Sequence, residues 1–121
     1  MVGTNLQRVA RVDEIPETGS LVVTVNGTEI GIFRVGSELV AWRNVCPHFA
    51  APVCKGTVAG TTLPSGVYQY EYGRDGEILQ CPWHGWEFDL RTGEHLAVGS
   101  RARLRQYSVE IHGDDVYVAA R

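Results

Sequence analysis

Two β-strands joined by a tight turn decide the fold of this chain: residues 21–35 read LVVTVNGTEIGIFRV. Residues 21–25 and 29–35 are rich in Val, Ile and Thr, whose branched side chains favour strands. Asn26-Gly27 lies between them, and this pair tolerates the positive φ angles of a two-residue hairpin turn. We therefore predict an antiparallel β-hairpin over this segment.

Similar short runs extend from the hairpin in both directions along the chain. Near the end, Tyr107, Val109 and Ile111 alternate with polar residues, which is the period of a half-buried strand. A single helical turn is predicted at residues 12–15. The pattern predicts an all-β fold, an antiparallel sandwich or barrel. The predicted strands are residues 6–12, 21–25, 29–35, 38–44, 68–72, 77–80, 107–112 and 116–118, with 68–72 and 77–80 forming a hairpin around residues 73–76.

Length and composition restrict the class of protein further. The 121 residues fit a single domain, 1–121, and 44% hydrophobic with 21% charged residues is typical of a globular chain. The net charge of −3 gives no indication of nucleic-acid binding. Residues 1–8 lack an apolar signal core, and no apolar run reaches membrane-spanning length, so we expect a cytoplasmic protein. In that compartment three cysteines indicate metal ligands or buried thiols rather than disulfides.

Two short segments carry the candidate chemistry: Cys46-Pro47-His48, and the run CPWHGW at residues 81–86. Each segment offers one thiol and one imidazole, at Cys46 and His48 and at Cys81 and His84. Thiolate and imidazole are ligands for zinc and for iron–sulfur clusters. The prolines that follow the cysteines stiffen both loops. The four residues are therefore candidate metal ligands.

Three interpretations of these segments are open. The first is that these are buried cysteines and histidines without a metal. That interpretation would account for one such pair, but two matched pairs count against it. A zinc-binding interaction module is the second, although zinc sites of this composition usually take both cysteines from one segment. A dinuclear cluster with two cysteines on one iron and two histidines on the other suits the mixed segments best.

The two segments resemble the cluster-binding boxes of the Rieske family. Residues 44–45 and 87–93 also look familial, and the run of short strands extends the resemblance over most of the chain. The resemblance implies a Rieske-like all-β fold with a cluster-binding subdomain at about 45–98, and one 2Fe–2S cluster per chain. Cys46 and Cys81 would hold the inner iron, and His48 and His84 the outer one.

The chain departs from that family pattern in ways that predict further properties. Residues 49–80 separate the boxes by about twice the usual family distance, with the extra length placed at 58–76 as a loop and hairpin. Cys54 has no obvious disulfide partner and is predicted to be a buried free thiol. Trp86 and Phe88 stand where high-potential relatives place hydroxyl donors, which predicts a midpoint potential of about −150 mV, the low end of the Rieske range.

The remaining residues add no catalytic site to this chain. His95 and His112 are too far apart in sequence to form the two-histidine, one-carboxylate iron site of an oxygenase. His95 follows a turn at Thr92-Gly93 and is expected to be a solvated surface residue, with a position near the cluster as the alternative. Arg101, Arg103 and Arg105 alternate with Ala102 and Leu104 and are expected on one face of a strand.

The resemblance implies a Rieske-type ferredoxin that carries one electron from a reductase to a terminal oxygenase or other oxidoreductase. Such a protein is an electron carrier and not an enzyme. It has no small-molecule substrate, nucleic acid or membrane among its partners. The alternative within electron transfer is a small subunit of a larger reductase, such as a nitrite-reductase-type enzyme.

Overall fold

The computed structural model describes residues 6–47, 52–66, 69–82, 86–97 and 99–119, and in 59–66 and 69–75 only the backbone. Strands dominate these residues, and the only helices among them are two 3-10 turns. None of the described helices is long and apolar enough to cross a membrane. The elements are β1 Leu6–Arg11, η1 Val12–Glu14, β2 Ser20–Val25, β3 Thr28–Val35, β4 Glu38–Arg43, η2 Val53–Lys55, β5 Thr57–Gly66, β6 Gln69–Gln80, β7 Glu87–Asp89, β8 Gln106–His112 and β9 Asp115–Ala119.

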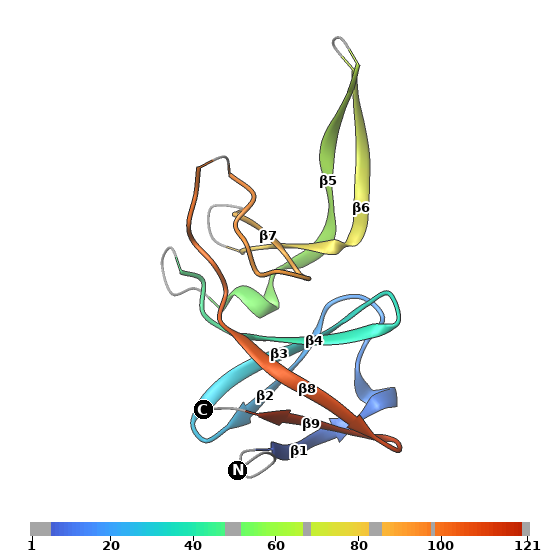
Figure 1. Cartoon of the computed structure of the whole chain (residues 1–121), viewed down its shortest axis with the longest axis vertical. Coiled ribbons are helices and arrows are strands. Elements are labelled where there is room, and N and C mark those ends of the chain that lie inside the picture. The colour runs from blue at the N-terminus through green and yellow to red at the C-terminus, as the bar shows by residue number, and fades with distance from the viewer. Residues whose placement is uncertain (1–5, 48–51, 67–68, 83–85, 98, 120–121) are drawn as a thin grey trace.

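Six strands form a nearly closed antiparallel sheet in the order β1-β9-β8-β4-β3-β2 (Figure 1). Its end strands, β1 and β2, contact each other. The predicted hairpin is confirmed as β2 and β3, paired from Ser20↔Phe33 to Val25↔Thr28. Asn26 and Gly27 have φ angles of 51° and 80°, as a two-residue hairpin turn requires. The all-β prediction is confirmed.

A second, three-stranded sheet, β5-β6-β7, lies at the other end of the molecule, and its β5–β6 hairpin projects away from the six-stranded sheet (Figure 1). The predicted hairpin of 68–72 and 77–80 is wrong, because residues 69–72 and 77–80 belong to the single strand β6, while residue 68 lies outside the described residues. The pairing with β5 instead shifts from Ala59↔Ile78 to Thr61↔Gly73. The Gly- and Asp-containing residues at 73–76 therefore form a bulge rather than a turn.

Two hydrophobic cores lie on opposite faces of β3 and β4. Ile30 and Ile32 point into the first, the barrel core, while Phe33 and Val35 point into the second, the site core. This is the two-residue period of a strand with both faces buried. The barrel core is Ala10, Ile15, Val25, Ile30, Ile32, Ala41, Tyr107, Val116 and Val118. The site core is Phe33, Val35, Trp42, Cys46, Val53, Cys54, Leu79, Cys81, Phe88, Leu90 and Leu104.

Candidate metal centre

Both candidate cysteine ligands lie just beyond the ends of strands and inside the site core. Cys46 follows β4 and Cys81 follows β6, and each is only 2% exposed. Both thiols are free of disulfides. The structure therefore brings together in one core two thiols that are 35 residues apart in sequence. Two soft sulfur ligands in a water-excluding core suit a metal centre that needs a fixed anchor.

The other two candidate ligands, His48 and His84, lie outside the described residues. Among the residues that the structure does describe, no group of three or more His, Cys, Asp or Glu is placed to hold a metal ion. The second box is nevertheless held as a closed loop, because the Cys81 N–H donates to the Trp86 carbonyl at 2.7 Å. The assignment of four ligands stays a prediction.

Asn44 anchors the first box, and its role was not predicted from the sequence. It is 4% exposed, and its Oδ1 accepts a 2.8 Å hydrogen bond from the Cys54 N–H. Its Nδ2 donates to Glu29 Oε1 at 3.1 Å, and its backbone N–H donates to the Glu29 carbonyl at 2.9 Å. One buried amide thus ties the segment before Cys46 to both β3 and η2. An amide side chain two positions before a candidate ligand was the available signal.

Cys54 is a buried free thiol, as predicted. It is 1% exposed, and its S–H donates to the Trp42 carbonyl at 3.4 Å. Burial, partly opposed by a hydrogen bond from the Gly31 backbone and reinforced by Glu29, raises the pKa of Cys54 to about 12. Such a thiol stays protonated at neutral pH, so it is neither a nucleophile nor a ready metal ligand.

An aromatic stack covers the site core next to the second box. The His95 ring lies flat on Trp86, with centroids 4.0 Å apart and an angle of 5° between the planes. Its Nδ1 is 2.8 Å from Ser100 Oγ, and Phe88 is 5.4 Å from it, centroid to centroid. His95 is partly buried, so the prediction of a solvated surface side chain does not hold for it. Sequence spacing gave no sign that His95 returns to residue 86.

The site core is joined to the barrel by a tryptophan. Trp42 is fully buried, and its Nε1–H donates to the Leu90 carbonyl at 3.0 Å. Gly93 packs so closely that a Cβ there would lie 2.6 Å from the Trp42 ring. The residues after β7 are therefore fixed to β4, which ends three residues before Cys46.

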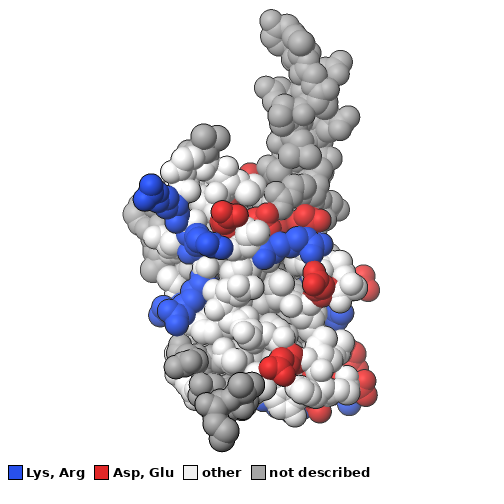
Figure 2. All heavy atoms as spheres, in the orientation of Figure 1, with Lys and Arg blue, Asp and Glu red and all other residues white. Residues whose placement is uncertain are grey.

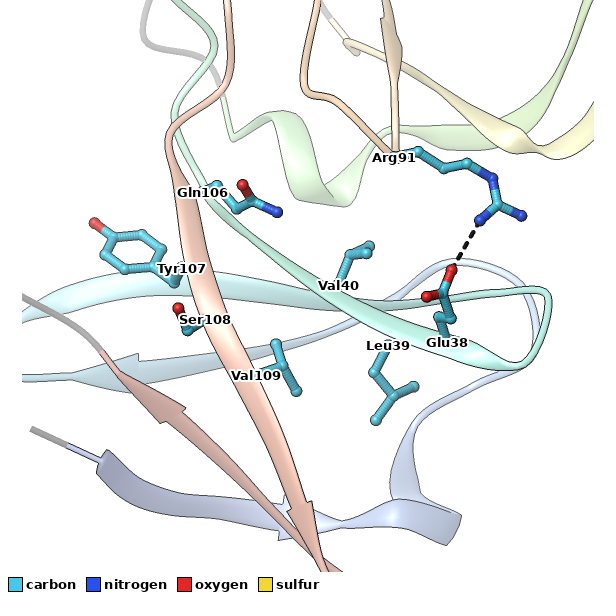
Figure 3. A pocket seen from close by; sticks show the side chains of 8 residues that line it. All are labelled: Glu38, Leu39, Val40, Arg91, Gln106, Tyr107, Ser108 and Val109. Atoms are coloured by element: carbon cyan, nitrogen blue, oxygen red, sulfur yellow. Dashed lines mark hydrogen bonds and ion pairs between the residues drawn. The ribbon is translucent and has the colours of Figure 1, made fainter. Parts of the chain in front are cut away.

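A cavity of about 600 Å³ opens elsewhere, where β4 and β8 diverge beyond their two paired positions (Figure 3). Arg91 and Glu38 form a 3.0 Å ion pair at one end of it. Neither Cys46 nor Cys81 lines the cavity. It is an open gap in the barrel wall and no part of the candidate metal centre.

Comparison with known proteins identifies the family. Residues 5–108 match the model of the Rieske [2Fe-2S] domain. The chain is 31% identical to the ferredoxin component of the naphthalene 1,2-dioxygenase system of Pseudomonas aeruginosa, over 87% of this chain and 86% of that protein. It is 28% identical to Ferredoxin CarAc of Metapseudomonas resinovorans, over 94% and 92%. The chain belongs to the Rieske [2Fe-2S] domain family.

A solved structure agrees with this assignment. The ferredoxin of carbazole 1,9a-dioxygenase from Nocardioides aromaticivorans IC177 superposes with a TM-score of 0.75 at 25% identity, covering 98% of this chain and all of that one. The predicted family, fold and 2Fe–2S cofactor are thus confirmed. The buried thiols of Cys46 and Cys81 fit that cofactor, because a 2Fe–2S cluster of this family takes two cysteine sulfurs.

Proposed function

We propose that this chain is the ferredoxin component of an oxygenase system and passes single electrons from a reductase to a terminal oxygenase. The chain is an electron-transfer protein of the Rieske family, and the similar ferredoxins belong to naphthalene and carbazole dioxygenase systems. We place it in the cytoplasm as a carrier with no substrate of its own. The division into a barrel and a cluster-binding subdomain at about 45–98 belongs to the same proposal.

The observation that carries the proposal is the burial of Cys46 and Cys81 in one core. We assign the cluster ligands as Cys46, His48, Cys81 and His84, one cysteine and one histidine from each box. When bound, the cluster supplies a one-electron redox change. The chain's own residues exclude water from the two sulfurs, hold the loops through Asn44 and the Cys81–Trp86 hydrogen bond, and present the rest of the site to a partner.

Reconstitution with iron and sulfide tests the cofactor and its ligands together. The protein is expected to be red-brown, to contain two irons and two sulfides per chain, and to lose visible absorption with dithionite. Substituting His84→Cys should alter the spectrum and the potential while the far-UV circular dichroism is kept. A colourless protein with one zinc per chain would instead support the zinc-binding module.

A redox titration tests the class of Rieske protein. Because Trp86 and Phe88 bring no side-chain hydroxyl to the site, we expect a midpoint of about −150 mV. The midpoint should fall at alkaline pH, since metal-bound imidazoles lose protons there. A clearly positive midpoint would exclude the low-potential assignment, and a midpoint independent of alkaline pH would exclude the pair of histidine ligands.

Gel filtration of the protein from its native host tests whether it is a free carrier. A ferredoxin component elutes alone at the size of its own chain. Elution with tightly bound subunits would instead favour the small subunit of a larger reductase.

A further inference from the structure

Four exposed arginines line one side of the molecule, and we call them the arginine ridge: Arg43, Arg101, Arg103 and Arg105. Arg43 ends β4, and the other three lie in the segment that leads into β8. The predicted strand over these three arginines is wrong, because the segment lies outside any strand. The predicted alternation is present, since Arg101, Arg103 and Arg105 are exposed. The Arg43 N–H donates to the Arg105 carbonyl at 2.9 Å, so the two parts of the ridge lie side by side.

Three of the ridge arginines, Arg43, Arg101 and Arg103, differ from Arg8 and Arg11 in their ion pairing. Arg8 pairs with Asp115 at 2.9 Å and Arg11 with Asp13 at 3.3 Å. Within the described parts of the chain, no carboxylate forms an ion pair with Arg43, Arg101 or Arg103. Figure 2 shows basic side chains gathered over the segment between β7 and β8. A chain of net charge −3 thus carries a concentrated positive surface.

Glu94 is the acidic residue whose backbone faces the ridge, in a bridge with Arg103. No ion pair joins the two side chains, and Arg103 Nη2 instead donates to the Thr92 carbonyl at 2.9 Å. The ridge therefore keeps its positive charge. Like charges placed side by side destabilise a fold, so this arrangement costs stability.

The backbone beneath the ridge is fixed. Leu104 points inward, 5% exposed in the site core, and its N–H donates to the Gly93 carbonyl at 2.8 Å. The His95 N–H donates to the Ala102 carbonyl at 3.1 Å, which ties the ridge to the residue stacked on Trp86. Arg105 lies over the Tyr107 ring, 5.7 Å from its centroid. These contacts give the charges a defined position relative to the candidate metal centre.

The ridge is also linked to that centre through the chain. Arg43 lies three residues before Cys46, and Arg101 follows the loop whose Ser100 holds His95. A partner seated on the ridge would therefore have the metal-binding end of the molecule beside its own surface. Electron transfer between proteins needs such close approach, and complementary charge directs it.

We propose that the arginine ridge docks an acidic face of the electron-transfer partner. The proposal rests on the proposed function, since it names the partner's surface chemistry for that same centre. The net charge of −3 on this chain would repel an acidic surface, and the ridge gives a partner with such a surface one orientation in which attraction replaces repulsion. Attraction of this kind acts mainly on the association rate and is screened by salt.

The test uses two small oxidants of opposite charge, ferricyanide and tris(phenanthroline)cobalt(III), with the reduced holoprotein in a stopped-flow instrument. The variant R43Q/R101Q removes two unpaired ridge charges. The matched control R8Q/R11Q removes two exposed charges from β1, which pairs with β9. Both variants have the same net charge and differ in where the charge is lost, although the control also breaks two exposed ion pairs.

The ferricyanide rate constant at low salt is expected to fall about threefold or more in R43Q/R101Q. The fall in the control is expected to be less than half as large. The cobalt rate constant should rise in the ridge variant. Poly-L-glutamate should slow the ferricyanide reaction of the wild type but not of the ridge variant.

Equal changes in the two variants would overturn the ridge proposal, because they would show an effect of net charge alone. That result would leave the proposed function intact, since both variants would still exchange electrons. A protein that binds no cluster would show no redox reaction with either oxidant. The proposed function would then fail, and the docking proposal with it.

Discussion

The two cores on opposite faces of β3 and β4 are filled by different chemistry. The barrel core consists of aliphatic side chains and one tyrosine, drawn from the six-stranded sheet and η1's neighbour Ile15. The site core contains all three cysteines of the chain, with three large aromatic rings. The first is a complete hydrophobic core made by the chain alone. The second includes two buried thiols whose positions are explained by a metal centre.

From this difference we expect the barrel to fold by burial alone and the site core to gain stability from its cofactor. Ligand binding that occurs only in the folded state adds its free energy to folding. Contacts at Trp42, Asn44 and Cys54 join the two cores. They decide how strongly a change in one core alters the stability of the other. Five predictions test this comparison, beginning with the largest expected effect.

Removing one candidate cysteine ligand should show the largest difference between the two cores, because it affects the site core and leaves the barrel core unchanged. Cys81→Ser is expected to abolish visible absorption and bound iron while the far-UV circular dichroism of the barrel strands persists. Cys54→Ser, the matched control, should keep the cluster, because a thiol with a pKa of about 12 is not a ligand. Iron analysis and spectroscopy measure both. Full iron content in Cys81→Ser would remove Cys81 from the ligand set.

The free energy of unfolding should depend on pH through the titration of the Cys54 thiol. Its pKa is raised from the ordinary value of 9.0 to about 12 in the folded chain. Below pH 9 the thiol is protonated in both states, so its contribution is fully present there. Between pH 9 and 12 the unfolded chain loses the proton first, and stability falls as pH rises, by an upper limit of about 4 kcal/mol.

The Cys54→Ala variant is the control for this titration. Urea unfolding at pH 8, 9, 10 and 11 should show a shallower decline in the variant than in the wild type. Parallel declines would mean that the buried thiol does not titrate in this window.

Gly93→Ala tests the packing between the two cores. A Cβ at this position would lie 2.6 Å from the Trp42 ring, whereas Gly99, with the same φ of 79°, has nothing within 4 Å. Both alanines bear the strain of positive φ, but only Gly93→Ala adds a clash. We expect Gly93→Ala to lower the free energy of unfolding by about 1–3 kcal/mol more than Gly99→Ala. Equal losses in urea unfolding would show that Trp42 moves aside freely.

Asn44→Ala removes the buried amide that joins β3, η2 and the first box. The Cys54 N–H would lose its acceptor, and an unpaired buried donor costs about 1–3 kcal/mol. The variant should bind the cluster with an altered visible circular dichroism, because Cys46 lies two residues away. Asn44→Asp keeps the acceptor for the Cys54 N–H but sets a second carboxylate beside Glu29, so both variants are compared in the Glu29→Gln background, where Asn44→Asp is expected to lose less stability. If both variants unfold alike, the hydrogen bond to Cys54 contributes little.

The smallest effect is expected at the ion pair of Glu38 with Arg91, which lies on the outside of the molecule. Its two side chains are 70% and 43% exposed, so solvent screens the attraction. Glu38→Gln should change the free energy of unfolding by less than about 1 kcal/mol, and less again in high salt. A larger loss in thermal unfolding would mean that this pair joins the two sheets more strongly than exposure suggests.

Much of the fold was predictable because the signals were local. Asn26-Gly27 fixes a hairpin by its own backbone preferences, and the alternating residues of β8 indicate a strand without knowledge of its neighbours. Residues 73–76 were predicted to form a turn and instead form a bulge, because the residue types that favour turns also suit bulges. Which of the two forms depends on the partner strand, β5, and not on the four residues themselves.

The sequence by itself determined the pairing of one cysteine with one histidine in each box, and with it the kind of metal centre the chain was expected to hold. Ligand chemistry depends on residue type and short spacing, which the sequence displays directly. Only the tertiary structure decided that Cys46 and Cys81 share one buried core, that Asn44 ties the first box to η2, and that His95 stacks on Trp86. These contacts join residues far apart in the chain, and the strand pairing that brings them together is a property of the whole sheet.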